Sequence, residues 1–234
     1  MGVLMPHTGQ VLVFDADDTL WENNVLFERV IHDYLNWLRH PTLDQAQLRA
    51  VLDDVQRANA VTHGYGSRML LRSLGDCVEK LCGRPATAQE LSEIEELAAV
   101  LVGYRVELIA DVAETLSVLS GRHTLLMLTK GNREEQQRKI DGSQLAHHFK
   151  AIDIVDEKDA ATYRSFVAEH GLTPATSWMI GNSPKSDILP ARAAGMNAVF
   201  IPNDHTWVLE HSELDPADDA VLRLRTFREL LDHF

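Results

Sequence analysis

The stretch VLVFDADDTLW, at residues 11–21, joins a short apolar run to two aspartates that lie two positions apart. A continuous apolar run bounded by polar residues is consistent with a strand buried on both faces of a parallel sheet. In open parallel sheets, ligands bind outside the carboxyl ends of the strands. Because alternate residues of an extended chain share a face, we expect Asp15 and Asp17 to lie together at that edge.

Two neighbouring carboxylates repel each other and need a cation or a shared proton. Magnesium and a phosphoryl group would suit Asp15 and Asp17. The alternative is a strand followed by an acidic turn, in which Asp18 and Thr19 cap the next helix. Taken alone, the stretch fits both interpretations about equally.

A second apolar run, at residues 125–128, ends in Thr129, Lys130 and Gly131. Glycine lets backbone N–H groups approach an anion, and the hydroxyl of Thr129 can donate a hydrogen bond to a phosphoryl oxygen. The pattern indicates a strand that leads into a loop of the size that holds a phosphate.

A third run, at residues 151–155, leads into an acidic loop that contains Lys158, and a fourth, at residues 176–180, is followed by Gly181 and Asp187. Lys158 alone fits a solvated charged loop, and Asp187 alone fits a helix cap as well as a metal ligand. Four strand-like runs that all end in groups suited to phosphate or magnesium are hard to explain by chance. Together they favour one shared phosphate site.

These motifs resemble those of the haloacid dehalogenase superfamily, and the resemblance covers nearly the whole chain. The first motif, DxDxT, matches residues 15–19, and the second, a Ser or Thr at a strand end, matches Thr129. Lys158 is similar to the third motif, and residues 181–183 followed by Asp187 are similar to the fourth. The central asparagine of the fourth motif replaces a second acid that many members carry.

The resemblance implies a reaction in which Asp15 attacks phosphorus and becomes an aspartyl phosphate. Asp17 would protonate the leaving group and then activate the water that hydrolyses this intermediate. Magnesium would be bound by Asp15, Asp187 and the backbone carbonyl of Asp17. The missing acid of the fourth motif therefore bears on magnesium affinity.

The resemblance also implies which groups bind the phosphoryl oxygens. Thr129, the backbone N–H of Lys130 or Gly131, and the ammonium of Lys158 would stabilise these oxygens as charge shifts in the transition state.

A magnesium-dependent phosphatase that hydrolyses a small phosphomonoester is therefore the expected function. The dehalogenase branch of the superfamily lacks the second aspartate of the first motif, so Asp17 argues against carbon–halogen cleavage. A phosphomutase or phosphotransferase of the same fold shares these motifs and stays open as an alternative. A non-catalytic protein of this fold that binds a small molecule is the other alternative.

Composition limits the partners of the chain. Its net charge of -13 speaks against binding to a nucleic-acid backbone, and no stretch approaches transmembrane length. The two cysteines, Cys77 and Cys82, lack metal-ligand spacing, and residues 1–10 contain no leader pattern. We expect a cytoplasmic monomer or homodimer that acts on a small-molecule phosphate ester, and neither on nucleic acid nor on a membrane.

Hydrophobic periodicity predicts two parts. Residues 1–20 and 106–234 are expected to form an α/β core with a doubly wound parallel sheet, and residues 21–105 an inserted cap of four helices. By resemblance, such a cap covers the active site and closes over small substrates. Tyr65 and Arg68, in a glycine-containing segment between two helices, are candidates for contacts with the leaving group. A plain interhelical turn is the alternative.

Two segments near the carboxyl terminus complete the prediction. Residues 203–207 follow a fifth strand, at residues 198–202, and are expected to border the site. Residues 220–234 are expected to form a terminal helix that packs on the core.

Overall fold

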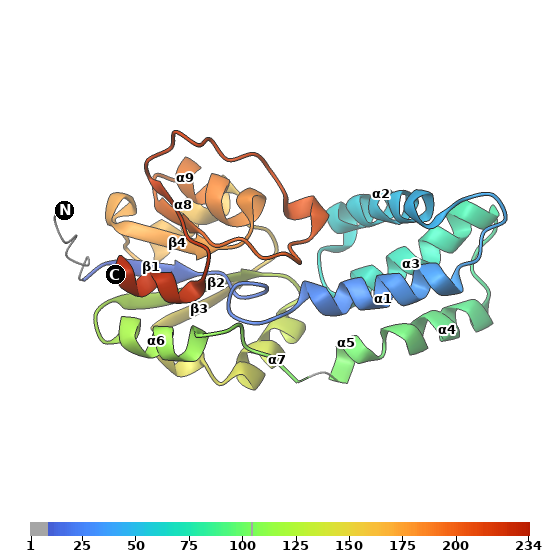
Figure 1. Ribbon diagram of the computed structural model, residues 1–234, viewed down its shortest axis with the longest axis horizontal. Helices are drawn as coiled ribbons and strands as arrows, with labels where there is room; N and C mark the ends of the chain where they lie inside the picture. Colours follow the sequence, from blue (N-terminus) through green and yellow to red (C-terminus); the bar gives the residue numbers. More distant parts are fainter. Residues whose placement is uncertain (1–8, 104) are drawn as a thin grey trace. The chain divides into compact units, whose positions relative to one another are not determined.

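A computed structural model describes residues 9–103 and 105–234, which fall into two compact units. The described residues up to Asn24 form one unit with Val106–Phe234, and those within Val25–Arg105 form the other (Figure 1). Residues 1–8, on which the absence of a leader was predicted, lie outside the described residues.

The first unit is built on a sheet of six parallel strands in the order β3-β2-β1-β4-β5-β6. This confirms the predicted α/β fold with a doubly wound parallel sheet. Its strands are β1 (Val11–Phe14), β2 (Thr124–Lys130), β3 (Ala151–Val155), β4 (Ser177–Gly181), β5 (Asn197–Phe200) and β6 (Val221–Arg223). The central position of β1 explains why its apolar run is continuous, since both of its faces are covered.

Different helices cover the two faces of the sheet, as Figure 1 shows for α6 on one side and α8 and α9 on the other. These helices are α6 (Val112–Ser120), α7 (Arg133–Ser143), α8 (Ala160–Glu169) and α9 (Leu189–Ala193). Leu12 and Phe14 pack in the cluster that contains residues of α6, whereas Val13 packs with residues of α8 and α9. Each fully buried side chain of this size contributes about 1.5–3 kcal/mol to the stability of the fold.

The prediction of a single helix at residues 220–234 was wrong. The segment begins with the edge strand β6, which pairs with β5, and continues into a 3-10 helix at Phe227–Asp232. Its apolar side chains, among them Leu224 and Phe227, are buried in the core. The spacing of these residues therefore reflects core contacts of a strand and a short turn, not one face of a helix.

The second unit is helical and has its own core, centred on fully buried side chains such as Tyr34, Leu52 and Leu74. The four expected helices are α1 (Asn24–Trp37), α2 (Gln45–His63), α3 (Ser67–Cys82) and α4 (Ala88–Ala98), and a short α5 (Val100–Gly103) follows them. Capping boxes at Asp44 and Thr87 start α2 and α4. Within the described part of the chain, no helix has both the length and the apolar character needed to cross a bilayer.

The helical unit starts at Val25 and not at residue 21, the predicted boundary. Trp21 is fully buried in the α/β core and bridges to Leu108, while the N–H of Ile109 donates to the carbonyl of Leu20 at 3.0 Å. The segments that leave and re-enter the core are thus paired with each other inside it.

Candidate active site

The predicted site residues lie where the parallel strands end. Asp15 directly follows β1, Thr129 lies near the end of β2, and Asp187 follows β4, the other neighbour of β1. Lys158 follows β3. Because parallel strands end at one edge, this order brings side chains from distant parts of the sequence together.

Lys158 joins two of the predicted carboxylates. Its ammonium donates to Oδ1 of Asp15 at 2.5 Å and to Oδ1 of Asp187 at 2.8 Å. The side chains of Lys158 and Asp187 are each only 1% exposed. The second oxygen of Asp15 accepts from the hydroxyl of Thr19 at 3.0 Å, and the second oxygen of Asp187 accepts from the N–H of Ser183 at 2.9 Å.

The charges of this cluster depend on one another. Burial alone would lower the pKa of Lys158, but the nearby charges of Asp15 and Asp187 raise it. Burial, and then the charge of Asp15, raise the pKa of Asp187, although Lys158 works in the opposite direction. Two carboxylates facing one ammonium leave an excess of buried negative charge when all three are ionised, and a further cation would relieve it.

The donors present fit a magnesium ion. Within the ranges that the structure describes, no group of three or more His, Cys, Asp or Glu side chains is arranged to hold a metal. Asp15 and Asp187 do supply two carboxylates that approach the same nitrogen. Magnesium is commonly bound by one or two carboxylates, with waters and a substrate phosphate as further ligands. Two carboxylates therefore match the protein contribution that a magnesium ion commonly has.

Asp187 is held by the local backbone after β4. It lies in a single π-helical turn, Pro184–Ile188, which Ser183 caps by accepting from the N–H of Ser186. Such turns are rare and often occur at functional sites. Gly181 makes room for the turn, because a Cβ at this position would overlap the carboxylate of Asp187. The glycine of the fourth motif is thus required by a close approach.

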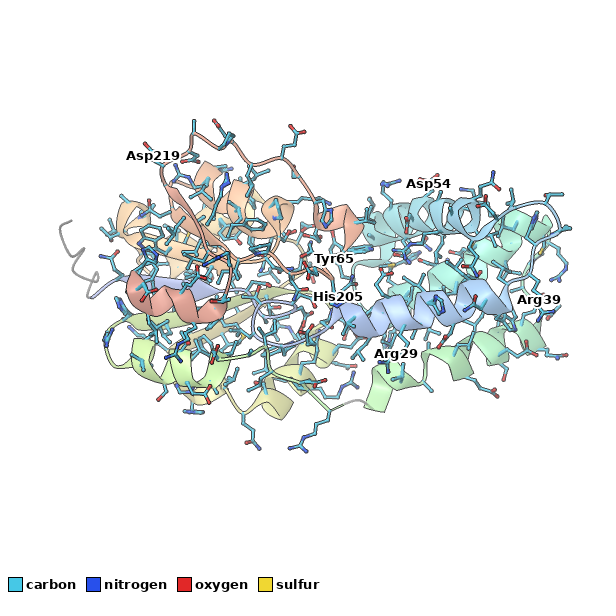
Figure 2. All side chains as sticks on the ribbon, in the orientation of Figure 1. Arg29, Arg39, Asp54, Tyr65, His205 and Asp219 are labelled. Carbon is cyan, nitrogen blue, oxygen red and sulfur yellow. The ribbon has the colours of Figure 1, made fainter. Side chains whose placement is uncertain are left out.

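Asn182 and the loop after β5 border the cluster. The hydroxyl of Thr19 donates to Oδ1 of Asn182 at 3.2 Å, and Nδ2 of Asn182 donates to the hydroxyl of Thr206 at 2.8 Å. The side chain of Asn203 donates to the carbonyl of Asp18 at 3.0 Å. The expected position of residues 203–207 beside the site is therefore correct; His205 of this loop is labelled in Figure 2.

The carboxylate of Asp17 is bound by a different set of side chains. Lys139 donates to both of its oxygens, at 2.6 and 2.5 Å. The indole N–H of Trp21 donates to Oδ1 at 2.7 Å, and Nε2 of Gln136 donates to Oδ2 at 2.8 Å. Asp15 is in contrast bound by Lys158 and Thr19, so the two aspartates of the first motif belong to separate hydrogen-bond clusters.

The N–H of Gly131 is one of the two backbone donors that were predicted to bind a phosphoryl oxygen. The N–H of Gly131 donates to the carbonyl of Val155 at 3.0 Å, so this donor already has a backbone partner. Gly131 has a backbone φ of 134°, which residues with a side chain rarely adopt. Thr129 is 1% exposed. The glycine is therefore explained by the turn itself.

Lys130 belongs to an ionic cluster that sequence reasoning missed. Its ammonium donates to Glu210 and to the hydroxyl of Ser186, both at 2.7 Å. The hydroxyl of Ser183 donates to Glu210 at 2.6 Å, and that of Ser186 also donates to it. Although burial opposes it, Lys130 lowers the pKa of Glu210. This cluster braces the turn that carries Asp187.

Three of these contact residues escaped prediction because their sequence signals are weak. Lys139 and Gln136 lie on α7, away from any strand end, and Glu210 lies in a short 3-10 helix that follows the loop after β5. One signal was available for α7. Residues 133–143 contain Ile140 as their one large apolar side chain, so a helix here that packs on the core must bury polar side chains, which need hydrogen-bond partners.

The two candidate specificity residues lie in the helical unit. Tyr65 is in the turn between α2 and α3, where it is half-buried and labelled in Figure 2, and Arg68 is exposed in the first turn of α3. The turn itself contains only residues 64–66. Arg68 therefore lies in α3 and not, as predicted, in the segment between the two helices.

Comparison with known proteins yields a family match across most of the chain. The family model described as haloacid dehalogenase-like hydrolase matches residues 10–195. This span includes Asp15, Lys158 and Asp187, together with the helical unit between them.

Individual relatives are more distant. The phosphoserine phosphatase of Thermus thermophilus is 29% identical over 136 residues, which are 56% of this chain and 53% of that protein. The match thus spans about half the length of that relative.

Two solved structures are similar over nearly their full length. A haloacid dehalogenase-like family hydrolase from Xanthomonas campestris has 25% identity and a TM-score of 0.78, covering 95% of this chain and 92% of its own. The HAD-hydrolase YfnB from Bacillus subtilis, solved with magnesium bound, has 17% identity and a TM-score of 0.66, covering 96% and 98%. At that identity, YfnB supports the fold alone.

Proposed function

Because the chain belongs to the haloacid dehalogenase-like hydrolase family, we propose that it is a magnesium-dependent phosphatase that hydrolyses a small phosphomonoester at Asp15. The observation that carries the proposal is the contact of the Asp15 carboxylate with Lys158, which also contacts Asp187. The similarity to a phosphoserine phosphatase supports the phosphatase reaction.

Asp15 acts as the nucleophile in this proposal. One carboxylate oxygen attacks phosphorus, the bond to the leaving oxygen breaks, and an aspartyl phosphate forms. Thr19 and Lys158 hold the two oxygens of Asp15 in a fixed orientation, which favours in-line attack. Lys158, and the hydroxyl of Thr129 at the neighbouring strand end, would bind the phosphoryl oxygens as charge develops on them.

Asp17 acts as the acid and then the base. Its proton goes to the leaving oxygen in the first step, and its carboxylate then takes a proton from the water that attacks the aspartyl phosphate. Each turnover thus converts the ester and one water into an alcohol and inorganic phosphate, and returns Asp17 to its protonated form.

Magnesium would be held by the carboxylates of Asp15 and Asp187 and by the backbone carbonyl of Asp17. When bound, it offsets the repulsion between the phosphate and the nucleophile. Ser183 contributes by fixing the second oxygen of Asp187 through its N–H. The ionic cluster of Lys130 and Glu210 contributes by bracing the turn that carries Asp187.

The helical unit, Val25–Arg105, would act as the cap that selects the substrate, with Tyr65 and Arg68 as its first candidate contacts. A small phosphomonoester is the substrate class that suits such a cap. Phosphoserine is the first compound to test, because a phosphoserine phosphatase is among the relatives. The cytoplasmic location predicted from the sequence is part of the same proposal.

The test is release of inorganic phosphate from an aryl phosphate, measured with magnesium and with a chelator. The unaltered protein should release phosphate only with magnesium. Asp15→Asn should lower the rate by roughly 10³-fold or more, since it removes the nucleophile. The control is Asp156→Asn, which changes an exposed aspartate of the loop before Lys158 and should leave the rate unchanged.

Substrate choice follows from a second measurement. Phosphoserine and a panel of sugar phosphates would be compared by kcat/KM with the same protein. Magnesium-independent release, or equal rates for the unaltered protein and Asp15→Asn, would contradict the proposal. Transfer of the phosphoryl group to a second alcohol in place of water would favour the phosphomutase or phosphotransferase alternative.

A further inference from the structure

The environment of Asp17 is unusual for a carboxylate that must exchange protons. Its side chain is 22% exposed, yet four hydrogen bonds from three side chains reach its two oxygens. Two donors, Lys139 and Gln136, come from α7, more than a hundred residues away in sequence. The third, Trp21, is fully buried.

The ammonium of Lys139 is fully occupied by its contacts with Asp17 and one neighbouring side chain. Two of its donor contacts reach the oxygens of Asp17, and a third, at 3.0 Å, reaches the side-chain oxygen of Asn23. Its side chain is 10% exposed, which is low for a lysine. An ammonium has three N–H groups, so these contacts account for all of its donors.

Gln136 is oriented by the same carboxylate. Its Nε2 donates to Oδ2 of Asp17 and to the carbonyl of Lys130, both at 2.8 Å. Its Oε1 is buried and has no hydrogen-bond partner among the described residues. A buried amide oxygen without a partner is unfavourable. The reversed amide would place that oxygen against a carboxylate, so donation to Asp17 determines the orientation.

We propose that Lys139 and Gln136 are positioning residues for Asp17, and that α7 sets the place from which Asp17 exchanges protons with the leaving group. The proposal rests on the proposed function, since it assigns a partner to the acid of that reaction. It explains why two of the buried positions of α7, 136 and 139, are a glutamine and a lysine, since both side chains donate to Asp17.

The consequence appears in how the rate depends on the leaving group. A leaving group of low pKa departs without a proton, whereas one of high pKa needs the acid. If Lys139 on α7 positions Asp17, loss of Lys139 will slow the reaction of esters with poor leaving groups far more than the reaction of esters with good ones. A merely structural role for Lys139 would slow both equally.

The experiment uses a series of ring-substituted phenyl phosphates, which share the phenyl phosphate framework and differ in the pKa of the phenol. Lys139→Met should lower the rate of formation of the aspartyl phosphate about 10²-fold for phenyl phosphate and only a few-fold for 4-nitrophenyl phosphate. The matched control is Arg138→Met, which removes a charge from an exposed position of the same helix and should leave the whole series unchanged.

A double-mutant cycle tests whether Lys139 acts through Asp17. In an Asp17→Asn background, Lys139→Met should have no further effect on the phenyl phosphate rate. Gln136→Met serves as a second variant, should Lys139→Met not fold. It should give the same dependence on the leaving group with a smaller amplitude.

The outcomes separate this inference from the proposed function. Equal rate losses across the series, or a full additional loss in the Asp17→Asn background, overturn the positioning role while leaving the phosphatase in place. No phosphate release by the unaltered protein from any member of the series overturns both.

Discussion

The ammonium of Lys158 lies 2.8 Å from Oδ1 of Asp187, and both side chains are almost fully buried. The same ammonium contacts Asp15 at 2.5 Å. Lys158→Met would leave two buried carboxylates without their counter-charge. We expect this variant to lose about 3–5 kcal/mol of unfolding free energy, together with phosphatase activity, as measured by urea denaturation in EDTA and by phosphate release.

Magnesium provides a further check of that prediction. Because a cation would replace part of the lost positive charge, the stability loss of Lys158→Met should be smaller in magnesium than in EDTA. Lys185→Met, at an exposed position in the turn that carries Asp187, is the control and should change stability little in either buffer. Equal losses in the two buffers would argue against a metal between the carboxylates.

Gly181→Ala should displace Asp187 by direct contact. The added Cβ would overlap the carboxylate of Asp187, which has no room to retreat because the residue is 1% exposed. We expect a loss of about 1–3 kcal/mol in unfolding free energy and weaker magnesium binding by calorimetry. Gly103→Ala, where a Cβ would meet nothing within 4 Å, is the matched control. Unchanged magnesium affinity in Gly181→Ala would show that Asp187 is not a ligand.

Asn182→Asp should strengthen magnesium binding. Asn182 accepts from the hydroxyl of Thr19, which also donates to Asp15, so a carboxylate here would add negative charge close to the proposed ligands. The hydroxyl of Thr206 would donate to the new carboxylate in place of accepting from the amide. We expect the magnesium concentration for half-maximal activity to fall about tenfold. An increase in that concentration would show that Asn182 serves the site through its amide.

Much of the fold was predictable because strand runs in a parallel sheet are long and apolar. The runs that became β1 to β5 were all recognised, and the parallel arrangement placed Asp15, Lys158 and Asp187 at one edge. β6 was missed because a three-residue edge strand is too short to show a period.

The site was only partly predictable because local sequence does not show which side chains meet across the fold. Asp17 was recognised, but its partner Lys139 lies on a helix with one apolar residue among its four buried ones. Glu210 lies in a region with little regular structure and contacts the ammonium of Lys130, a residue for which only a role of the backbone N–H had been predicted. Contacts of this kind depend on where loops and helices lie in the folded chain, and the local sequence does not show this.

Asp18 should make stability fall as pH rises. Burial, more than the nearby charges, raises the pKa of Asp18 to about 7, although the N–H groups of Asn23 and Asn24 donate to it. Between the ordinary pKa of an aspartate and 7, the folded state therefore binds more protons than the unfolded state. Linkage then requires that the contribution of Asp18 to stability decreases through this window.

Asp18→Asn tests this sign directly. Asparagine can accept the same two N–H groups and tolerates the φ of 60° at this position, but it does not ionise. In EDTA, the difference in Tm between the variant and the unaltered protein should shift in favour of the variant as pH rises from about 5 to about 8. Groups that do not interact with Asp18 titrate alike in both proteins and cancel in the difference. A shift in the opposite direction would mean that the hydrogen bonds from Asn23 and Asn24 favour the ionised carboxylate more than burial disfavours it.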